Sequence, residues 1–126
     1  MITRREWMRS AGQAVLGAAV ANRFGEYARA DSPARPTVCF FSKHLPDLQW
    51  SELGKAVKGA GFDGVDLTVR AKGHVLPERP DDLPRAVNAI TSQGSAVPMI
   101  TTDLTSASDP RAKPLLQTAV RCGVQY

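Results

Sequence analysis

The chain has 126 residues, which is enough for one modest domain. Its formal net charge is +4, but residues 1–30 hold five arginines against two glutamates and so account for +3 of it. The rest of the chain is nearly balanced, with 11 basic and 10 acidic residues. Such a body lacks the Lys/Arg cluster that binds phosphate backbones, which argues against nucleic acid as a partner.

Residues 1–30 have the parts of an export signal in the expected order. Paired arginines lie in TRREWM (3–8), a weakly apolar stretch covers 14–21, and ARA (28–30) offers small residues to a signal peptidase. This resembles a twin-arginine signal, which implies a periplasmic or other extracytoplasmic location. That route carries folded proteins, often with a cofactor. The alternative is a cationic amphipathic helix on a cytosolic protein. The apolar run is shorter than the roughly 20 residues of a membrane span, so we expect no stable membrane anchor.

Cys39 and Cys122 are the only cysteines, and they form no CxxC or Cys/His pattern. A zinc or redox site built from them is therefore not expected. We interpret both as small, buried, apolar residues. In an oxidising compartment a disulfide is the alternative, and the sequence does not show whether the two residues meet.

The first predicted unit follows a proline-containing linker at residues 31–36. TVCFF (37–41) is an apolar, β-branched and aromatic run, which predicts a strand. In residues 48–61 apolar residues recur at spacings of three and four, which predicts a helix. Asp47 or Ser51 is the expected N-cap, and Gly61 suits the position after the helix.

Two further units repeat this order. VDLTV (65–69) predicts a strand, and the next helix starts near Asp81 or Asp82 and closes at Gly94. AVPMIT (96–101) predicts a third strand, in which Pro98 marks a local irregularity because proline has no N–H for the ladder.

The last predicted helix has Asp109 as its cap and Pro110 in its first position, and Gly123 closes it. Residues 124–126 then begin a fourth strand.

The closing glycines recur about every 30 residues, which is the length of a βα unit. Such a repeat requires parallel strands and allows either a doubly wound sheet or a (β/α)8 TIM barrel. The strand at 65–70 has one apolar face and one polar face, made by Asp66, Thr68 and Arg70. This favours the barrel, because doubly wound strands are apolar on both faces. A barrel needs about 250 residues, so we expect residues 37–126 to be its first three βα units and the start of a fourth strand.

Chemistry in such folds lies at the carboxyl ends of the strands. The polar residues there are Ser42, Lys43 and His44; Asp66, Thr68, Arg70, Lys72 and His74; and Thr101, Thr102 and Asp103. Their cations and hydroxyls suit a polyhydroxylated or anionic small molecule. Each has a simpler interpretation. Lys43 and Lys72 are also typical solvated loop charges, Asp103 suits a turn cap, and Arg70 suits an ion pair with Asp66 or Glu78.

The motifs ELGKAVKGAGFDGVDLTVRAKGHVLPERPDDLPRAV (52–87) and VPMITTDLTSASDP (97–110) resemble the N-terminal half of sugar phosphate isomerase/epimerase proteins. That family belongs to the xylose-isomerase-like barrel superfamily and includes members with twin-arginine signals. The resemblance covers residues 37–126. GFDGVDL is shared across the superfamily, whereas TVRAKGHVLPER and MITTD are more particular.

The resemblance implies carbohydrate metabolism by a metal-dependent aldose–ketose isomerase or epimerase. There a divalent ion of unknown identity polarises the oxygens of an open-chain sugar or sugar phosphate, while a carboxylate moves a proton. The family's metal ligands come mainly from later strands, so no metal ligand and no catalytic residue is carried over. The expected substrate-binding residues are Lys43, His44, Arg70 and His74, and this part alone is expected to be inactive.

Two alternatives remain open. One is a non-catalytic carbohydrate-binding or structural barrel remnant. The other is a metal-dependent endonuclease acting on abasic DNA, which the near-neutral body disfavours.

Overall fold

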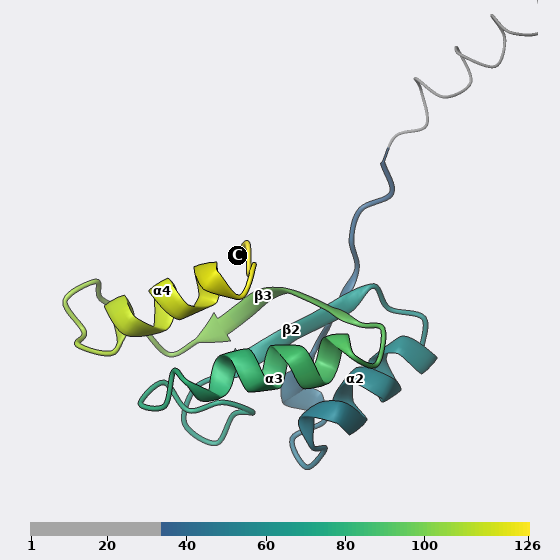
Figure 1. The fold of residues 1–126 in the computed structure, drawn as a ribbon, viewed down its shortest axis with the longest axis horizontal. Helices are drawn as coiled ribbons and strands as arrows, with labels where there is room; N and C mark the ends of the chain where they lie inside the picture. Colours follow the sequence, from purple (N-terminus) through teal and green to yellow (C-terminus); the bar gives the residue numbers. More distant parts are fainter. Residues whose placement is uncertain (1–33) are drawn as a thin grey trace, which may run out of the picture. The chain divides into compact units, whose positions relative to one another are not determined.

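The structure is a computed structural model that describes residues 34–126, so the predicted export signal lies outside the described residues. In chain order the elements are β1 (Cys39–Phe41), the 3₁₀ helix η1 (Ser42–His44), α2 (Trp50–Gly59), β2 (Gly64–Val69), α3 (Asp82–Thr91), β3 (Ala96–Thr102) and α4 (Ala112–Arg121) (Figure 1). Strands and α-helices alternate, which confirms the α/β class. Residues 37–126 form one compact unit.

The three strands form a parallel sheet in the order β1-β2-β3, with β2 in the middle. After α4 the chain returns to this sheet. The Tyr126 N–H donates to the Pro98 carbonyl at 3.1 Å, and the Ile100 N–H donates to the Tyr126 carbonyl at 2.9 Å. These two bonds flank Met99 in the manner of a parallel strand pair. Residues 124–126 therefore lie beside β3, although they do not form a fourth strand of the sheet.

The predicted irregularity at Pro98 is confirmed as a bulge in β3. Gly64 pairs with Ala96, but Asp66 already pairs with Met99, so β3 has one more residue than β2 over this interval. The bulge places proline where no ladder N–H is needed. A Cβ on Gly64 would lie 2.9 Å from Pro98 Cδ, so the proline ring fits only because position 64 has no side chain.

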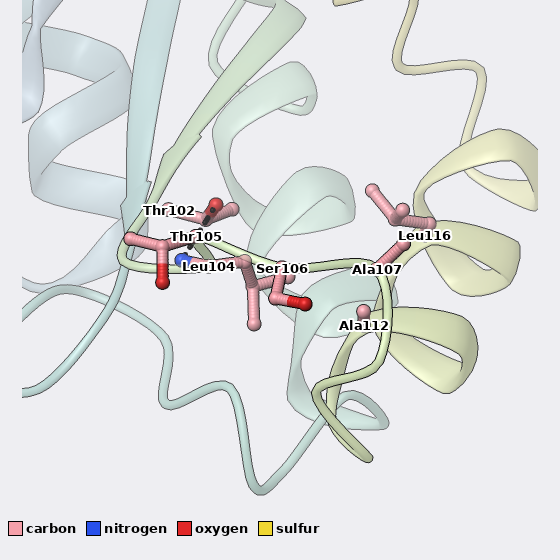
Figure 2. A pocket seen from close by; sticks show the side chains of 7 residues that line it. All are labelled: Thr102, Leu104, Thr105, Ser106, Ala107, Ala112 and Leu116. Carbon is pink, nitrogen blue, oxygen red and sulfur yellow. Dashed lines mark hydrogen bonds between the residues drawn. The ribbon is translucent and has the colours of Figure 1, made fainter.

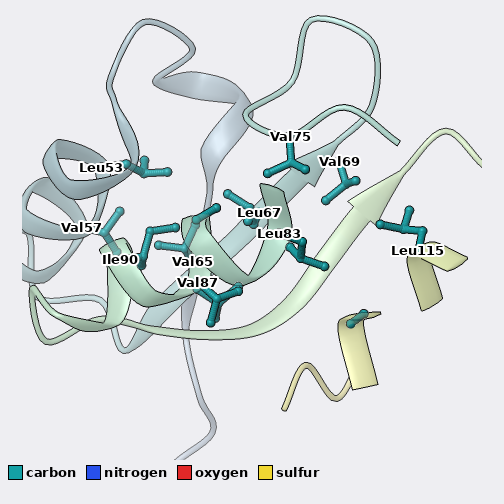
Figure 3. Close-up of a cluster of buried hydrophobic side chains, with 13 residues drawn as sticks. Leu53, Val57, Val65, Leu67, Val69, Val75, Leu83, Val87, Ile90 and Leu115 are labelled. Atoms are coloured by element: carbon teal, nitrogen blue, oxygen red, sulfur yellow. The ribbon is translucent and has the colours of Figure 1, made fainter. Parts of the chain in front are cut away.

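The core is the layer between the helices and one face of the sheet (Figure 3). Its members are Leu53 and Val57 of α2; Val65, Leu67 and Val69 of β2; Leu83, Ala86, Val87 and Ile90 of α3; Val97 of β3; Leu115 and Ala119 of α4; and Val75. Burial of each large aliphatic side chain stabilises the fold by about 1.5–3 kcal/mol. Since α2, α3 and α4 all contribute to this one layer, they lie on the same face of the sheet.

The helix boundaries differ in part from the predictions. Helix α3 has Asp81 as its N-cap, as predicted. Helix α2 instead starts after Gln49, whose N–H donates to Glu52 Oε2 at 3.0 Å, so Asp47 and Ser51 do not cap it. This is one half of a capping box, a pattern the sequence reading overlooked because glutamine is a rare N-cap.

Helix α4 also begins later than predicted, at Ala112 with Arg111 as its N-cap. Asp109 accepts the Arg111 N–H at 2.9 Å and so caps the preceding turn, in which Pro110 lies. Pro114 occupies the first helical turn instead, where its missing N–H costs nothing. The three predicted closing glycines, Gly61, Gly94 and Gly123, all have left-handed φ values near +80°.

No helix within residues 34–126 is long and apolar enough to cross a membrane.

Candidate functional site

The four predicted substrate-binding residues all lie in the segments that follow β1 and β2. Lys43 and His44 form part of η1, directly after β1, and both are exposed. Arg70 follows β2 and is half-buried, and His74 lies four residues further along. The parallel register of β1 and β2 brings these two segments to one edge of the sheet. The structure therefore places all four residues at the same edge, but it gives them different environments.

His74 is held by hydrogen bonds within the chain. Its Nδ1 lies 3.1 Å from Thr68 Oγ1, and its Nε2 lies 3.1 Å from the Leu45 carbonyl oxygen. Trp50 Nε1 donates to the His74 carbonyl at 2.9 Å. Both ring nitrogens thus have partners, and burial lowers the pKa of the ring below its ordinary value. As placed here, His74 offers no free nitrogen to a ligand.

Two buried hydroxyls complete this cluster. Ser42 and Thr68 are 0% and 1% exposed. Ser42 Oγ lies 3.2 Å from Thr68 Oγ1 and accepts the Thr68 N–H at 2.9 Å. These hydroxyls were predicted to lie near a binding mouth, but they join the ends of β1 and β2 beneath the surface.

His44 and Arg70 are more accessible to a ligand. The His44 ring lies edge-on to the rings of Phe40 and Phe41, with centroid distances of 6.3 and 5.8 Å. Among residues 34–126, neither Asp66 nor Glu78 forms an ion pair with Arg70, so the structural pairing considered for it is not formed. Both side chains are therefore available at the edge of the sheet.

The loop after Arg70 is tightly folded. The Gly73 N–H donates to the Arg70 carbonyl at 2.8 Å, and the Arg70 N–H donates to the Val75 carbonyl at 3.1 Å. Lys72 has a left-handed φ of 59°, which is uncommon for a residue with a side chain. A Cβ on Gly73 would lie 2.9 Å from the Thr68 carbonyl oxygen. Only glycine therefore fits at position 73. The tight turn that it allows brings His74 into hydrogen-bond contact with Thr68.

The sheet face opposite the helices carries polar groups at its centre. Thr101 Oγ1 donates to the Asp66 carboxylate, at 2.9 Å to Oδ1 and 3.0 Å to Oδ2. Asp66 pairs with Met99 and Thr68 pairs with Thr101, so these four side chains share one face. Asp66 also contributes to a raised pKa of the Cys39 thiol, for which burial is the larger cause.

A second polar group surrounds Arg111. Its guanidinium contacts Asp109 at 2.8 Å, Glu78 at 3.0 Å and Asp103 at 3.5 Å. Hydrogen bonds from Arg111 lower the pKa of Asp109, and Asp109 and Glu78 in turn raise the pKa of Arg111. Asp103, for which a turn cap was the simpler interpretation, lies in this group through its contact with Arg111. Sequence reading missed Arg111 because it was placed inside a helix.

The cavity in Figure 2 lies at the end of β3 and has a volume of about 360 Å³. Its lining is Thr102, Leu104, Thr105, Ser106, Ala107, Ala112 and Leu116. Thr102 pairs with Val69, a core residue, so the cavity opens on the helix side of the sheet rather than beside Asp66. None of the four predicted substrate-binding residues lines it.

Metal and thiol chemistry find little support among the described residues. Residues 34–126 contain no group of three His, Cys, Asp or Glu side chains positioned to hold a metal ion. Cys39 and Cys122 are half-buried free thiols, so no disulfide joins them. Burial raises the pKa of the Cys122 thiol, as it does for Cys39. Both thiols therefore stay protonated at neutral pH.

A scan against protein-family models, a search of curated proteins and a search of solved structures each find no match to this chain.

Proposed function

We propose that residues 37–126 are the N-terminal part of a (β/α)8 barrel of the xylose-isomerase-like type, and that the carboxyl edge of its sheet binds a sugar or sugar phosphate. On this proposal the chain belongs to a sugar isomerase or epimerase that the twin-arginine route exports to the periplasm or another extracytoplasmic space.

The polarity of the sheet face opposite the helices is the observation that carries the proposal. Helices α2, α3 and α4 share a single core layer, whereas the other face has the Asp66 carboxylate bonded to Thr101 at its centre. A doubly wound sheet would bury that second face under further helices, where an unpaired carboxylate is costly. In a barrel the same face lines the lumen and leads to the site at the carboxyl edge.

The residues at this edge divide into two roles. Lys43, His44 and Arg70 are accessible donors of hydrogen bonds, and the cations Lys43 and Arg70 suit phosphate and hydroxyl oxygens. His74, by contrast, has both ring nitrogens bonded within the chain. We therefore assign substrate contact to Lys43, His44 and Arg70, and a positioning role to His74.

A divalent metal does not fit the donors that this part of the chain supplies. Asp66 is bonded to Thr101, and Glu78, Asp103 and Asp109 surround Arg111. Residues 34–126 bring no three ligands together. We derive no step through a metal here, and the proposed contribution of these residues is to bind and orient the substrate.

Because these carboxylates already have partners within the chain, a second candidate is a non-catalytic carbohydrate-binding protein. A measurement of deuterium incorporation distinguishes isomerisation from binding alone. An isomerase that moves a proton through a base incorporates solvent deuterium at the carbon next to the carbonyl, whereas a binding protein does not.

The proposal is tested by titrating the ¹⁵N-labelled chain with fructose 6-phosphate, with fructose and with inorganic phosphate as separate probes. We expect fructose 6-phosphate to shift amide resonances in residues 42–44 and 68–74. Lys43→Gln and Arg70→Gln should each weaken its binding about three- to tenfold, as loss of one charge-assisted contact predicts.

Lys55→Gln and Arg121→Gln are the matched controls, because they remove the same charges from α2 and α4, away from this edge. They should leave the affinity unchanged. If none of the probes binds, or if the controls weaken binding as much as the edge variants do, the proposed sugar site is wrong. On this proposal the isomerase is active only as a complete barrel, so incubation of the complete barrel protein in D₂O with Mn²⁺ and fructose 6-phosphate then distinguishes isomerase from binding protein by deuterium incorporation.

A further inference from the structure

The His74 ring joins two loops that are far apart in the sequence. One ring nitrogen meets Leu45 in the loop between η1 and α2, and the other meets Thr68 at the end of β2. The His74 carbonyl also accepts the indole N–H of Trp50, the first residue of α2. The ring is therefore the point at which the loop after β1, the loop after β2 and the start of α2 are held together.

The partners of the ring determine which nitrogen carries its proton. A carbonyl oxygen only accepts hydrogen bonds, so the bond to Leu45 requires a proton on Nε2. Nδ1 is then an acceptor, and the Thr68 hydroxyl donates to it. The geometry thus assigns the neutral Nε2–H tautomer to His74.

The remaining bonds of the cluster agree with this assignment. The Thr68 oxygen has two lone pairs, which accept the His74 N–H at 3.2 Å and the Ser42 hydroxyl at 3.2 Å. Ser42 Oγ in turn accepts the Thr68 N–H at 2.9 Å. Each hydroxyl then donates one hydrogen bond: Ser42 donates to Thr68, and Thr68 donates to His74 Nδ1. All of these bonds can form together only with the protons in this arrangement.

A proton added to Nδ1 turns this nitrogen from an acceptor into a donor. The Nδ1–H and the Thr68 hydroxyl would then be two donors facing each other, and Thr68 would have to turn its proton toward Ser42. Ser42 would lose its acceptor, although its side chain is fully buried. A buried donor without a partner is costly, so the protonated ring favours an arrangement in which the two loops separate.

Nearby charges offer the protonated ring no compensation. The titratable groups on the elements packed against it are Lys43 and His44 of η1; Asp47 of the next loop; Glu52, Lys55 and Lys58 of α2; Asp66 of β2; and Arg70, Lys72, Glu78, Arg79 and Asp81 of its own loop. Asp66 is bonded to Thr101, and no carboxylate within residues 34–126 forms an ion pair with His74. Burial accordingly lowers the pKa of the ring, opposed by backbone hydrogen bonding at Leu45 and Leu48.

We propose that His74 is a pH-sensitive latch, which holds the loops after β1 and β2 together when neutral and releases them when protonated. The two loops carry Lys43, His44 and Arg70, so release changes the spacing of these side chains at the edge of the sheet. The latch depends only on the contacts of the described residues, and it stands whether or not the edge binds a sugar.

The sign of the pH dependence follows from the lowered pKa. Below the ordinary histidine value of 6.5 the opened state binds more protons than the latched state. The latch is therefore intact above pH 6.5 and weakens as the pH falls from 6.5 through the pKa of the latched ring.

The latch is tested by NMR on the full chain between pH 8 and pH 5. At pH 8 the imidazole ¹⁵N shifts should report the Nε2–H tautomer for His74. On acidification, amides in residues 42–48 and 70–75 should lose protection against hydrogen exchange by about three- to tenfold after correction for the intrinsic rate. Amides of α3 should keep theirs.

His44→Gln is the matched control, because His44 is the only other histidine in the chain and is exposed. This variant should keep the loop response, and His74→Gln should abolish it. The latch is wrong if His74 is the Nδ1–H tautomer, if it titrates at or above 6.5, or if loop protection is unchanged once the ring is protonated. The wild-type measurements decide this even if His74→Gln does not fold.

Discussion

At the scale of single residues, the Thr68 hydroxyl has the largest predicted effect on stability. It donates to His74 and accepts from Ser42, and all but 1% of the residue is buried. Thr68→Val leaves the buried Ser42 hydroxyl proton without an acceptor and His74 Nδ1 without a donor, which should lower the free energy of unfolding by about 2–3 kcal/mol.

Urea unfolding of the two proteins at pH 7.5 measures this loss. Thr105→Val, which makes the same change at an exposed position, should stay within about 0.5 kcal/mol of the wild type. Equal effects of the two substitutions would show that the buried cluster does not stabilise the fold.

Arg111 sets the titration of a neighbouring carboxyl group. Its hydrogen bonds hold the pKa of Asp109 below the ordinary value of 3.8, so this contact contributes stability above that pH and loses it as the pH falls through the lowered pKa. Arg111→Gln should return the Asp109 pKa toward 3.8, as measured by ¹³C NMR of the carboxyl carbon. Arg85→Gln, which breaks the ion pair with Asp82 instead, should leave Asp109 unchanged. No change at Asp109 in Arg111→Gln would contradict this assignment.

The sequence predicted the positions of the candidate residues at the strand ends but not their contacts. Lys43, His44, Arg70 and His74 lie at strand ends, and strand ends are visible as the points where apolar runs stop. The partners of His74 cannot be predicted in this way. Thr68 meets the ring because the loop after β2 folds back, and Leu45 meets it from the segment that follows the neighbouring strand β1. Arg111 was missed for a similar reason, since Glu78 approaches it from 33 residues away.

At the scale of elements, the contact between α2 and α3 depends on a missing side chain. A Cβ on Gly54 would lie 2.7 Å from the Ile90 carbonyl oxygen, which is backbone and cannot move aside cheaply. Gly54→Ala should therefore destabilise the protein by about 1–3 kcal/mol through overpacking, although alanine is the better helix former.

Gly59 provides the control within the same helix. A Cβ there would meet nothing within 4 Å, so Gly59→Ala should stabilise the protein by about 0.5–1 kcal/mol. Thermal unfolding of both variants measures the difference. Opposite signs are expected; the same sign in both would mean that α2 and α3 are not in this close contact.

Element types were easier to predict than element boundaries. The apolar spacing in α2, α3 and α4 and the β-branched runs in β2 and β3 determine those elements, because both patterns match the face that becomes buried. The starts of α2 and α4 depend on competing caps. Several polar residues precede each helix, and their order alone does not show which one meets a backbone N–H.

At the scale of the whole molecule, β2 is the central strand of the sheet, and the outer sides of β1 and β3 differ. Strand β2 pairs with β1 and β3, and β3 pairs in addition with residues 124–126. Amides of β2 should therefore show the highest protection in hydrogen exchange, and β1 should exchange faster than β3. Exchange monitored by mass spectrometry or NMR checks this order. Protection of β1 equal to that of β2 would show that something else covers the β1 edge.

The periodicity of the sequence predicts parallel βα units but does not distinguish a barrel from an open doubly wound sheet. A βα repeat of about 30 residues is common to barrels and doubly wound sheets. The polar face at Asp66 and Thr101 favours the proposed barrel, because burying a carboxylate under helices is costly.

The pairing of strands in chain order also has a consequence for the folding rate. Ser42 meets Thr68 across 26 residues, and Asp66 meets Thr101 across 35. Each new strand thus closes a loop of similar, moderate length. The entropy lost in each closure costs about 3 kcal/mol by chain statistics. The contacts of a single βα unit offset this cost. Folding can then advance one unit at a time along the chain, without waiting for distant segments to find one another.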